Sequence, residues 1–244
     1  MISGWNKRYS EILREFKYSE KQDTESAIIL DSILRKTFPV KKINEQIKGK
    51  TVFVIGAGPS LSLAIPILKK FKKTVKIVAD SAVKPLVENG IKPDIVVTDL
   101  DGDKDSLVKV GKTNSIFVVH AHGDNIAKLY LVENFKNCIG TTQSKPFKNI
   151  QNFGGFTDGD RAVFLASHFD AKKIILFGMD FGKKIGKYSQ TKPAERKIKL
   201  KKLRKAKSLL EWLSGKTRSQ LFTTSSPIKG FEKTSYSELD MIIT

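Results

Sequence analysis

Short, β-branched apolar runs alternate with segments of helical periodicity through most of this 244-residue chain. Such an alternation favours a parallel sheet, because each strand is followed by a helix that crosses over to the next strand with right-handed chirality. We predict strands at residues 51–55, 74–78, 94–98, 115–119, 137–140 and 173–177, and a last strand at 221–224. The predicted fold class is therefore α/β, with a Rossmann-like, doubly wound and mainly parallel sheet.

Helical spacing fills most of the connections between these strands. Apolar residues three or four apart predict helices that end near Leu68, Asn89 and Phe135, and the predicted helix at 162–168 places His168 in a core position. Pro66 is expected to kink the first of them.

The N-terminal segment, residues 1–48, differs from this alternation. Trp5, Tyr9 and Ile12 begin a pattern of helical spacing that predicts two helices, and residues 43–47 predict a further turn. We expect a helical appendage packed on the core; a separate DNA-binding helical domain is the alternative.

The C-terminal part is strongly basic. Residues 183–207 contain twelve Lys or Arg against one acid, while Leu203, Ala206, Leu210 and Leu213 keep an apolar stripe at helical spacing. This predicts a packed helix with a basic outer face, either simply solvated or a nucleic-acid surface. The expected organisation is an appendage at 1–48, a Rossmann-like catalytic core at 49–215, and a C-terminal strand and tail at 216–244.

The net charge of +19 and the pI near 9.8 indicate an anionic partner, either nucleic acid or a small polyphosphate. Cys138 is the single cysteine, which excludes an internal disulfide framework, and three histidines argue against a multi-ligand zinc site. No apolar stretch approaches the roughly 18 residues that a membrane span needs, and the N-terminus lacks a secretory signal. We therefore expect a cytoplasmic protein.

Acidic side chains follow the third predicted strand. In an extended segment, Asp99 and Asp101 would share one face, and Gly102 lets the backbone turn immediately afterwards. Mg²⁺ prefers carboxylate oxygens, and open α/β sheets bind ligands at the carboxyl ends of their strands. A magnesium site is one interpretation, and a solvated Asp-rich turn is the other.

A glycine turn follows the first predicted strand. Gly56 and Gly58 allow a phosphate to approach free N–H groups at a helix start. As a dinucleotide fingerprint the motif is defective, because Leu61 occupies the third glycine position, although Asp80 lies near the spacing of a ribose-binding acid. A tight strand-to-helix turn explains the glycines equally well.

Two further polar clusters belong to the same predicted rim. His120-x-His122-x-Asp124 resembles half of a zinc site, but its second half is missing, so we interpret His122, Asp124 and Asn125 as polar substrate or phosphate contacts.

The other cluster, Thr157, Asp158, Asp160 and Arg161, follows two glycines at a helix start. It suits a second metal, a phosphate or the N–H donors of a heterocycle, although an N-cap would explain one acid. Several such clusters on one rim favour a metal and polyphosphate site.

Six motifs in order resemble one known family, the archaeal 6-hydroxymethyl-7,8-dihydropterin pyrophosphokinases. They are Gly-Ala-Gly-Pro-Ser-Leu at 56–61, Thr-Asp-Leu-Asp-Gly at 98–102, His-Ala-His-Gly-Asp-Asn at 120–125, Gly-Thr-Thr-Gln at 140–143, Gly-Gly-Phe-Thr-Asp-Gly-Asp-Arg-Ala at 154–162 and Gly-Met-Asp-Phe-Gly at 178–182. The resemblance covers residues 50–190. That family is similar in turn to the catalytic domain of thiamin pyrophosphokinase, whose Gly-Asp-x-Asp-Ser motif matches here only in its two acids, since Thr98 and Gly102 flank them.

The resemblance implies diphosphoryl transfer from ATP to the pterin hydroxymethyl group, with Mg²⁺ as cofactor and AMP as leaving group. It implies Asp99 and Asp101 as magnesium ligands, with Asp80 as ligand or ribose contact. The full set of nominated residues is catalytic Asp99, Asp101, Asp124, Asp158, Asp160 and Arg161; cofactor-binding Gly56, Gly58, Ser60, Asp80, His122 and Asn125; and metal-binding Asp99, Asp101 and Asp80.

Within this set, Asp124 or Asp158 is expected to accept from the pterin N–H donors, and Arg161 to balance phosphate charge. The expected partners are ATP and the dihydropterin alcohol, without a membrane and with nucleic acid disfavoured; a homodimer is left open. The alternatives are the same chemistry on thiamin, an NAD-binding oxidoreductase, and a basic nucleic-acid-binding module.

Overall fold

The computed structural model describes residues 2–34, 36–189 and 191–243. Its centre is one eight-stranded sheet with the order β5-β4-β3-β2-β1-β6-β7-β8, in which every neighbouring pair is parallel. The strands are β1 (Thr51–Ile55), β2 (Val75–Ala79), β3 (Ile95–Thr98), β4 (Ile116–Ala121), β5 (Cys138–Thr142), β6 (Lys173–Phe177), β7 (Gln220–Thr223) and β8 (Glu232–Lys233). This confirms the doubly wound α/β class and the parallel sheet.

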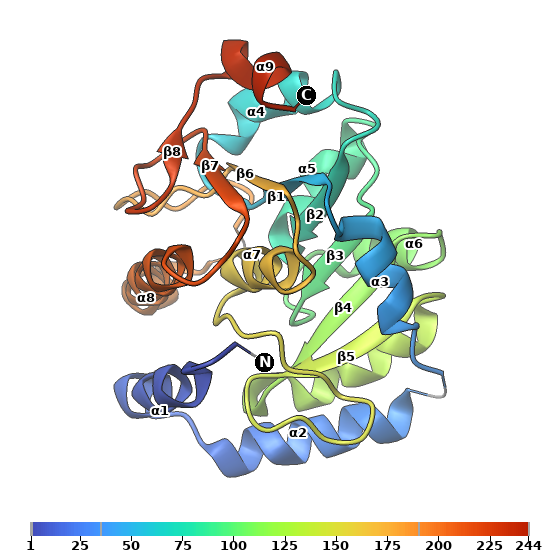
Figure 1. The fold of residues 1–244 in the computed structure, drawn as a ribbon. Coiled ribbons are helices and arrows are strands. Elements are labelled where there is room, and N and C mark those ends of the chain that lie inside the picture. Colours follow the sequence, from blue (N-terminus) through green and yellow to red (C-terminus); the bar gives the residue numbers. More distant parts are fainter. Residues whose placement is uncertain (1, 35, 190, 244) are drawn as a thin grey trace.

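Helices cover both faces of this sheet (Figure 1). The α-helices are α1 (Trp5–Phe16), α2 (Glu20–Ile33), α3 (Val40–Ile47), α4 (Leu61–Leu68), α5 (Val83–Glu88), α6 (Lys104–Gly111), α7 (Asp158–His168), α8 (Arg196–Ser214) and α9 (Leu239–Ile243). The 3₁₀ helices are η1 (Asp80–Ala82), η2 (Gly123–Asn134), η3 (Pro193–Glu195) and η4 (Tyr236–Glu238).

Alternation of side chains along the strands creates two separate cores. Val52 and Val54 of β1 belong to one apolar cluster, together with residues of α1, α3, α7 and α8. Phe53 and Ile55 point to the opposite face and join residues of α2, α4, α5 and α6. Because β1 is buried on both sides, its sequence is continuously apolar rather than alternating.

The N-terminal helices pack on the sheet and do not form a core of their own. Trp5 and Ile12 of α1 are buried in the first cluster, and Leu30 of α2 is buried in the second. Ion pairs also join α1 to α8: Lys205 Nζ of α8 lies 3.1 Å from Glu15 and 3.7 Å from Glu11 of α1. Figure 1 shows α1 beside α8, and α2 along the β5 edge of the sheet.

Some local predictions were wrong. The helix α6 was not predicted, and residues 123–134 form a 3₁₀ helix rather than an α-helix. The C-terminal tail contains β8 and α9, and Leu239 is fully buried. His168, which was predicted to be a core histidine, ends α7 and is exposed, with its ring against Phe153 and Phe169. Periodicity did not locate α6, β8 or α9 because such short elements carry few apolar positions.

The polarity of the sheet determines where a site can form. The order of strands reverses direction between β1 and β6, so their carboxyl ends border a topological switch point, where α/β sheets bind ligands. α7 packs across β1, β2 and β3, and precedes β6 in the chain. None of the helices within the described ranges combines the length and apolar character needed to span a membrane.

Candidate active site

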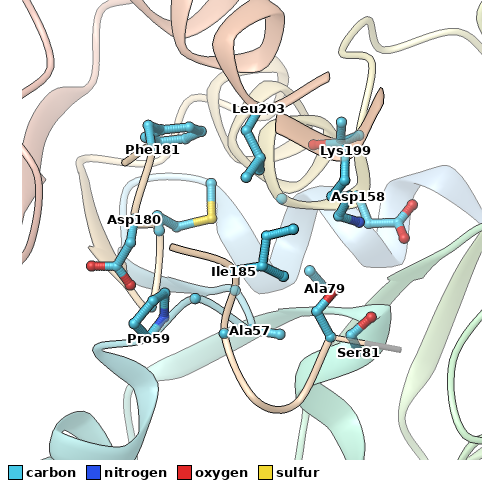
Figure 2. A pocket seen from close by; sticks show the side chains of 18 of the residues that line it. Ala57, Pro59, Ala79, Ser81, Asp158, Asp180, Phe181, Ile185, Lys199 and Leu203 are labelled. Carbon is cyan, nitrogen blue, oxygen red and sulfur yellow. The ribbon is translucent and has the colours of Figure 1, made fainter. Parts of the chain in front are cut away.

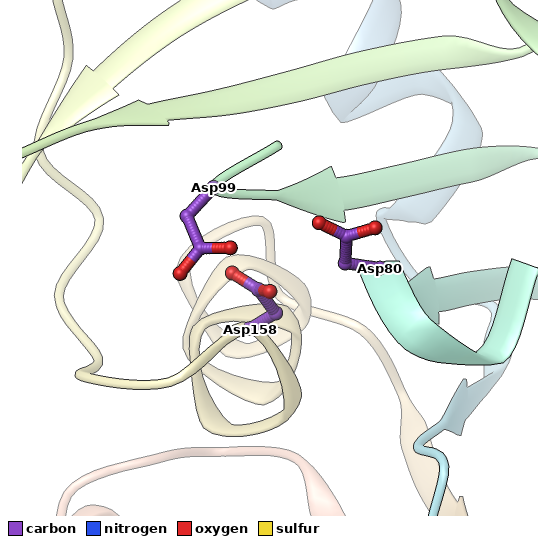
Figure 3. A group of neighbouring side chains, drawn as sticks. All are labelled: Asp80, Asp99 and Asp158. Carbon is purple, nitrogen blue, oxygen red and sulfur yellow. The ribbon is translucent and has the colours of Figure 1, made fainter. Parts of the chain in front are cut away.

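Three carboxylates meet at the carboxyl edge of the sheet. Asp80 follows β2, Asp99 follows β3, and Asp158 is the first residue of α7. One oxygen from each lies within 4.8 Å of the others, and Figure 3 shows the three groups converging. Parallel strands bring their ends to the same edge, and α7 contributes the third acid because its N-terminus lies at that edge.

Asp80 is buried and only half satisfied. Its Oδ2 accepts hydrogen bonds from Thr98 Oγ1 at 2.6 Å and from Asp101 N at 3.0 Å. Its Oδ1 is also buried but has no partner among the described residues. Burial, and secondarily the neighbouring Asp99, raises the pKa of Asp80 to about 7. An unpaired buried carboxylate oxygen is costly, which makes this atom a candidate cation ligand.

Asp99 is held in its charged form. Burial alone would raise the pKa of Asp99, but the adjacent His122, followed by Arg161, lowers it well below its ordinary value. His122 Nδ1 accepts from Asp124 N at 3.2 Å, and its Nε2 lies 3.7 Å from Asp99 Oδ2. His122 therefore contacts the carboxylate group directly, while Asp124 is exposed at the rim.

Asn125 is a structural clamp rather than a free ligand contact. It is 1% exposed, and its Nδ2 donates to the backbone oxygens of Asp99 at 2.8 Å and His120 at 2.7 Å. Its Oδ1 accepts from His122 N at 3.1 Å. Asn125 was predicted to contact substrate or phosphate; in the structure its polar atoms bind the backbone beneath Asp99.

Asp158 is paired with Arg161, one turn along α7. Burial and then the charge of Asp99 raise the pKa of Asp158 well above its ordinary value, while Arg161 opposes the shift. Arg161 Nη1 donates to Asp158 Oδ1 at 3.2 Å, and the arginine is only 7% exposed. The predicted grouping of these two residues is therefore present, and the guanidinium offsets part of the negative charge.

Asp101 lies outside the three-carboxylate group. The segment is not extended as we expected, because Leu100 adopts a φ of 68° and reverses the backbone between Asp99 and Asp101. The Asp101 side chain is exposed and pairs with Lys128, while its backbone N–H donates to Asp80. The predicted pairing of Asp99 with Asp101 on one face is thus replaced by a group that contains Asp158.

Asp160 caps the N-terminus of α7 and does not face the carboxylate group. It is fully buried, and its two oxygens accept from Phe156 N, Thr157 N and Thr157 Oγ1 at 2.6–2.7 Å. This matches a capping box, in which the carboxylate of the third helical residue accepts from the N–H groups of the two residues that precede α7. Asp160, which was predicted to be catalytic, therefore uses both carboxylate oxygens in hydrogen bonds within the protein.

The glycine turn is occupied by protein contacts. Gly58 N donates to Gly178 O at 2.8 Å, and Asp180 Oδ2 accepts from both Ser60 N and Ser60 Oγ. A Cβ at Gly58 would lie 2.4 Å from Asp180 Oδ2 and 2.6 Å from Gly178 O. The glycines therefore permit the loops after β1 and β6 to touch. Free N–H groups were predicted at this helix start, but those of Gly58 and Ser60 are paired.

His120 belongs inside β4 rather than at its end. It is 2% exposed, its Nδ1 lies 3.3 Å from Thr141 Oγ1, and burial followed by the charge of Arg161 lowers its pKa. A neutral buried imidazole fits a supporting role. The His120-His122 pair is not part of the carboxylate group, so a zinc half-site is not what the described residues form.

Two hollows meet at the carboxylates. The apolar hollow, about 110 Å³, lies over the glycine turn and is enclosed by Phe181, Ile185 and Leu203, with Asp158 and Lys199 at one end (Figure 2). The acidic hollow, about 540 Å³, contains the three carboxylates and has Tyr18, Phe156 and several lysines in its wall. The residues that line both hollows are Ser81, Thr157, Asp158, Ser189 and Lys199.

Sequence reasoning missed most of this wall. The lysines Lys128, Lys192, Lys199 and Lys202 line the acidic hollow, and all but Lys128 come from the basic segment that ends in α8. That segment had been interpreted mainly as a solvated face. The concentration of positive charge was the one sequence signal that could have indicated this role. The sequence does not show which side of α8 faces the sheet edge.

The fold and the site together define a doubly wound α/β protein with a carboxylate group and surrounding lysines, an arrangement suited to a divalent cation and phosphate groups. The family model described as "6-hydroxymethylpterin diphosphokinase MptE-like" matches residues 29–186. The chain belongs to this family, which confirms the resemblance seen in the motifs.

Curated relatives agree over nearly their whole length. Proteins named 6-hydroxymethyl-7,8-dihydropterin pyrophosphokinase are 47% identical in Methanocaldococcus jannaschii, 44% in Pyrococcus furiosus and 39% in Methanothermobacter thermautotrophicus. The alignments cover 88%, 91% and 87% of this chain, and 96%, 97% and 94% of the relatives.

A solved structure, the MAf glycosyltransferase from Magnetospirillum magneticum, shares the fold with a TM-score of 0.53 and 19% identity. The match covers 78% of this chain but only 34% of that one, and it bears on the fold alone.

The neighbouring acids Asp158 and Asp160 give a matched pair of variants. We expect Asp160→Asn to lower the free energy of unfolding by about 1–3 kcal/mol, because the capping box loses acceptors for buried donors. Asp158→Asn should keep that stability but weaken divalent-cation binding. Urea denaturation and calorimetric Mg²⁺ titration of both variants test this, and equal losses of stability would contradict the assignment of separate roles.

The raised pKa of Asp80 predicts how stability without metal depends on pH. A carboxyl whose pKa rises on folding, here from 3.8 to about 7, contributes stability that is fully present below the lower value and is lost as pH rises through the upper one. As pH rises from about 4 to 8, the free energy of unfolding of the wild type should therefore fall by more than that of Asp80→Asn. The difference between the two decreases is expected to be at most about 4 kcal/mol. Urea unfolding in EDTA across this range measures it; parallel profiles would contradict the shift.

Proposed function

We propose that this chain transfers the β,γ-diphosphate of ATP to the hydroxymethyl group of 6-hydroxymethyl-7,8-dihydropterin and releases AMP. The observation that carries the proposal is the group formed by Asp80, Asp99 and Asp158, which lies among lysines in a member of the diphosphokinase family. The names of the three relatives support the same reaction.

The donor set fits Mg²⁺. The three carboxylates offer oxygen atoms at one point, and the unpartnered Oδ1 of Asp80 is available as a ligand. Asp80, Asp99 and Asp158 would hold the ion, which in this class of reaction neutralises charge on the phosphate oxygens. His122, Arg161 and the Asn125 clamp keep these carboxylates in place.

The two hollows suit the two substrates. The apolar hollow offers Phe181, Ile185 and Leu203 as apolar contacts for adenine, and charged side chains such as Asp180 and Lys184 also line it. Its junction with the acidic hollow is bordered by Asp158 and Lys199, where a triphosphate chain would extend. The acceptor alcohol would then bind in the acidic hollow, on the far side of the phosphates.

The chemistry asks mainly for positioning and charge balance. The hydroxymethyl oxygen forms a bond to the β-phosphorus, the bond from that phosphorus to the oxygen bridging to the α-phosphate breaks, AMP retains this oxygen, and the hydroxyl proton is released to water. Lys199 and Lys202 border the hollow in which negative charge gathers. This use of the basic segment accounts for part of the +19 net charge without a nucleic-acid partner.

Product analysis tests the reaction directly. We expect AMP, and not ADP, when the purified protein is incubated with ATP, Mg²⁺ and the dihydropterin alcohol, because the bond on the α side of the β-phosphorus is broken. Thiamin in place of the pterin should give no AMP above the acceptor-free control. Chromatographic separation of the nucleotides measures both. AMP formed with thiamin but not with the pterin would contradict the proposed acceptor and identify thiamin as the substrate.

The position of Asp101 outside the carboxylate group predicts unequal effects of two similar substitutions. We expect Asp99→Asn to reduce Mg²⁺-dependent AMP release by about 100-fold or more, since even residues that only orient metal ligands cost about 10–100-fold. Asp101→Asn should cost less than about 10-fold on the same scale. Initial rates at several Mg²⁺ concentrations, with circular dichroism to verify folding, provide the measurement. Wild-type rates from Asp99→Asn, or the reverse order, would refute the metal assignment.

A further inference from the structure

The acidic hollow has an aromatic wall that the proposed chemistry does not use. Tyr18, from the turn between α1 and α2, and Phe156, from the segment before α7, line this hollow together with the carboxylates. Tyr18 is half-buried and Phe156 is 4% exposed. The ring centroids are 6.4 Å apart and the ring planes are inclined at 47°, so Phe156 packs beside Tyr18 in the wall of the hollow.

Tyr18 is fixed before any ligand arrives. Its backbone N–H donates to Leu13 O at 3.0 Å, after Lys17 ends α1 in the left-handed conformation with a φ of 58°. Its ring stacks on Phe16 with centroids 5.7 Å apart and planes 23° apart. Lys202 Nζ lies over the Tyr18 ring, 5.5 Å from its centre, so this lysine has to move aside for a ligand to stack on that face.

We propose that Tyr18, supported by Phe156, is the platform on which the flat face of the pterin rests, and that it determines recognition of the acceptor. The inference deepens the proposed function and rests on it. If the adenine occupies the apolar hollow, the acceptor must lie in the acidic one, because both substrates have to reach the carboxylates at the junction.

The chemistry of the wall fits a bicyclic heterocycle. Aromatic side chains bind planar rings face to face, while polar groups around the edge satisfy the ring donors and acceptors. In the acidic hollow the edge groups are Asp124, Thr191, Lys192 and Glu195. The apolar hollow has Phe181 as its aromatic lining residue and fewer groups of this kind.

This platform gives the N-terminal helices a role in the site. Tyr18 lies before residue 29, where the match to the family model begins, and α8, which supplies Lys202, lies after residue 186, where it ends. Ion pairs join α8 to α1, the helix that precedes Tyr18, and Tyr18 and α8 together line one side of the hollow. The family core carries the carboxylates, and the flanking helices carry the platform.

The test compares Tyr18→Ala with Tyr18→Phe in the full-length protein. We expect Tyr18→Ala to weaken binding of 6-hydroxymethyl-7,8-dihydropterin by about 10- to 100-fold, as loss of one aromatic stacking partner typically does. The Mg-ATP affinity should stay within about 2-fold, and Tyr18→Phe should bind the pterin nearly as well as the wild type because the ring is retained. Isothermal titration with each substrate, and KM for each substrate separately, provide the readouts.

Two controls make the result decisive. Tyr130→Ala removes an aromatic ring that is 61% exposed on η2, outside both hollows, and should change neither affinity. Tyr18→Leu preserves apolar packing on Phe16 if the alanine variant fails to fold, and it should show the same loss of pterin binding.

The outcomes separate this inference from the proposed function. Unchanged pterin affinity in Tyr18→Ala or Tyr18→Leu, or a loss of Mg-ATP affinity in its place, would overturn the platform while leaving the reaction intact. A wild-type protein that neither binds nor diphosphorylates the pterin would overturn both.

Discussion

Mutual repulsion among three closely placed carboxylates is the constraint around which this molecule is arranged. Asp80, Asp99 and Asp158 bring oxygen atoms within 4.8 Å of one another, where two unscreened negative charges are strongly unfavourable. Burial, and then the charge of Asp99, raises the pKa of Asp80 and of Asp158, while the neighbouring His122 and Arg161 lower that of Asp99. Such a group is stable when it is partly protonated or when a divalent cation compensates its charge.

The supporting contacts show how the fold maintains this arrangement. Asn125 ties the backbone of β3 and β4 together beneath Asp99, and Thr98 fixes one oxygen of Asp80 so that the other is left unpaired. Asp160 caps the helix that carries Asp158. These residues resemble catalytic ones in the sequence because they are polar and lie close to the site, but their hydrogen bonds are made within the protein.

The flanking segments complete what the sheet begins. The sheet edge supplies negative charge, and α8 with the turn before α2 covers it with lysines and Tyr18. A phosphate-transfer site needs both signs of charge, since a cation binds the carboxylates and the phosphates also require cationic partners. Three residues of the basic segment, Lys192, Lys199 and Lys202, accordingly lie in the wall of the acidic hollow.

The sequence by itself determined the parallel α/β fold, the family and the rim on which the site lies, because strand periodicity, glycine turns and strand-end acids are local patterns. It also nominated Asp80, Asp99, Asp158 and Arg161, which the structure brings together. Only the tertiary structure decided that Asp158 rather than Asp101 joins the carboxylate group, because that depends on the left-handed Leu100 and on where α7 begins relative to β3. It likewise decided which polar residues are consumed as caps and clamps, and which lysines of α8 face inward, since hydrogen-bond partners distant in sequence leave no periodic signal.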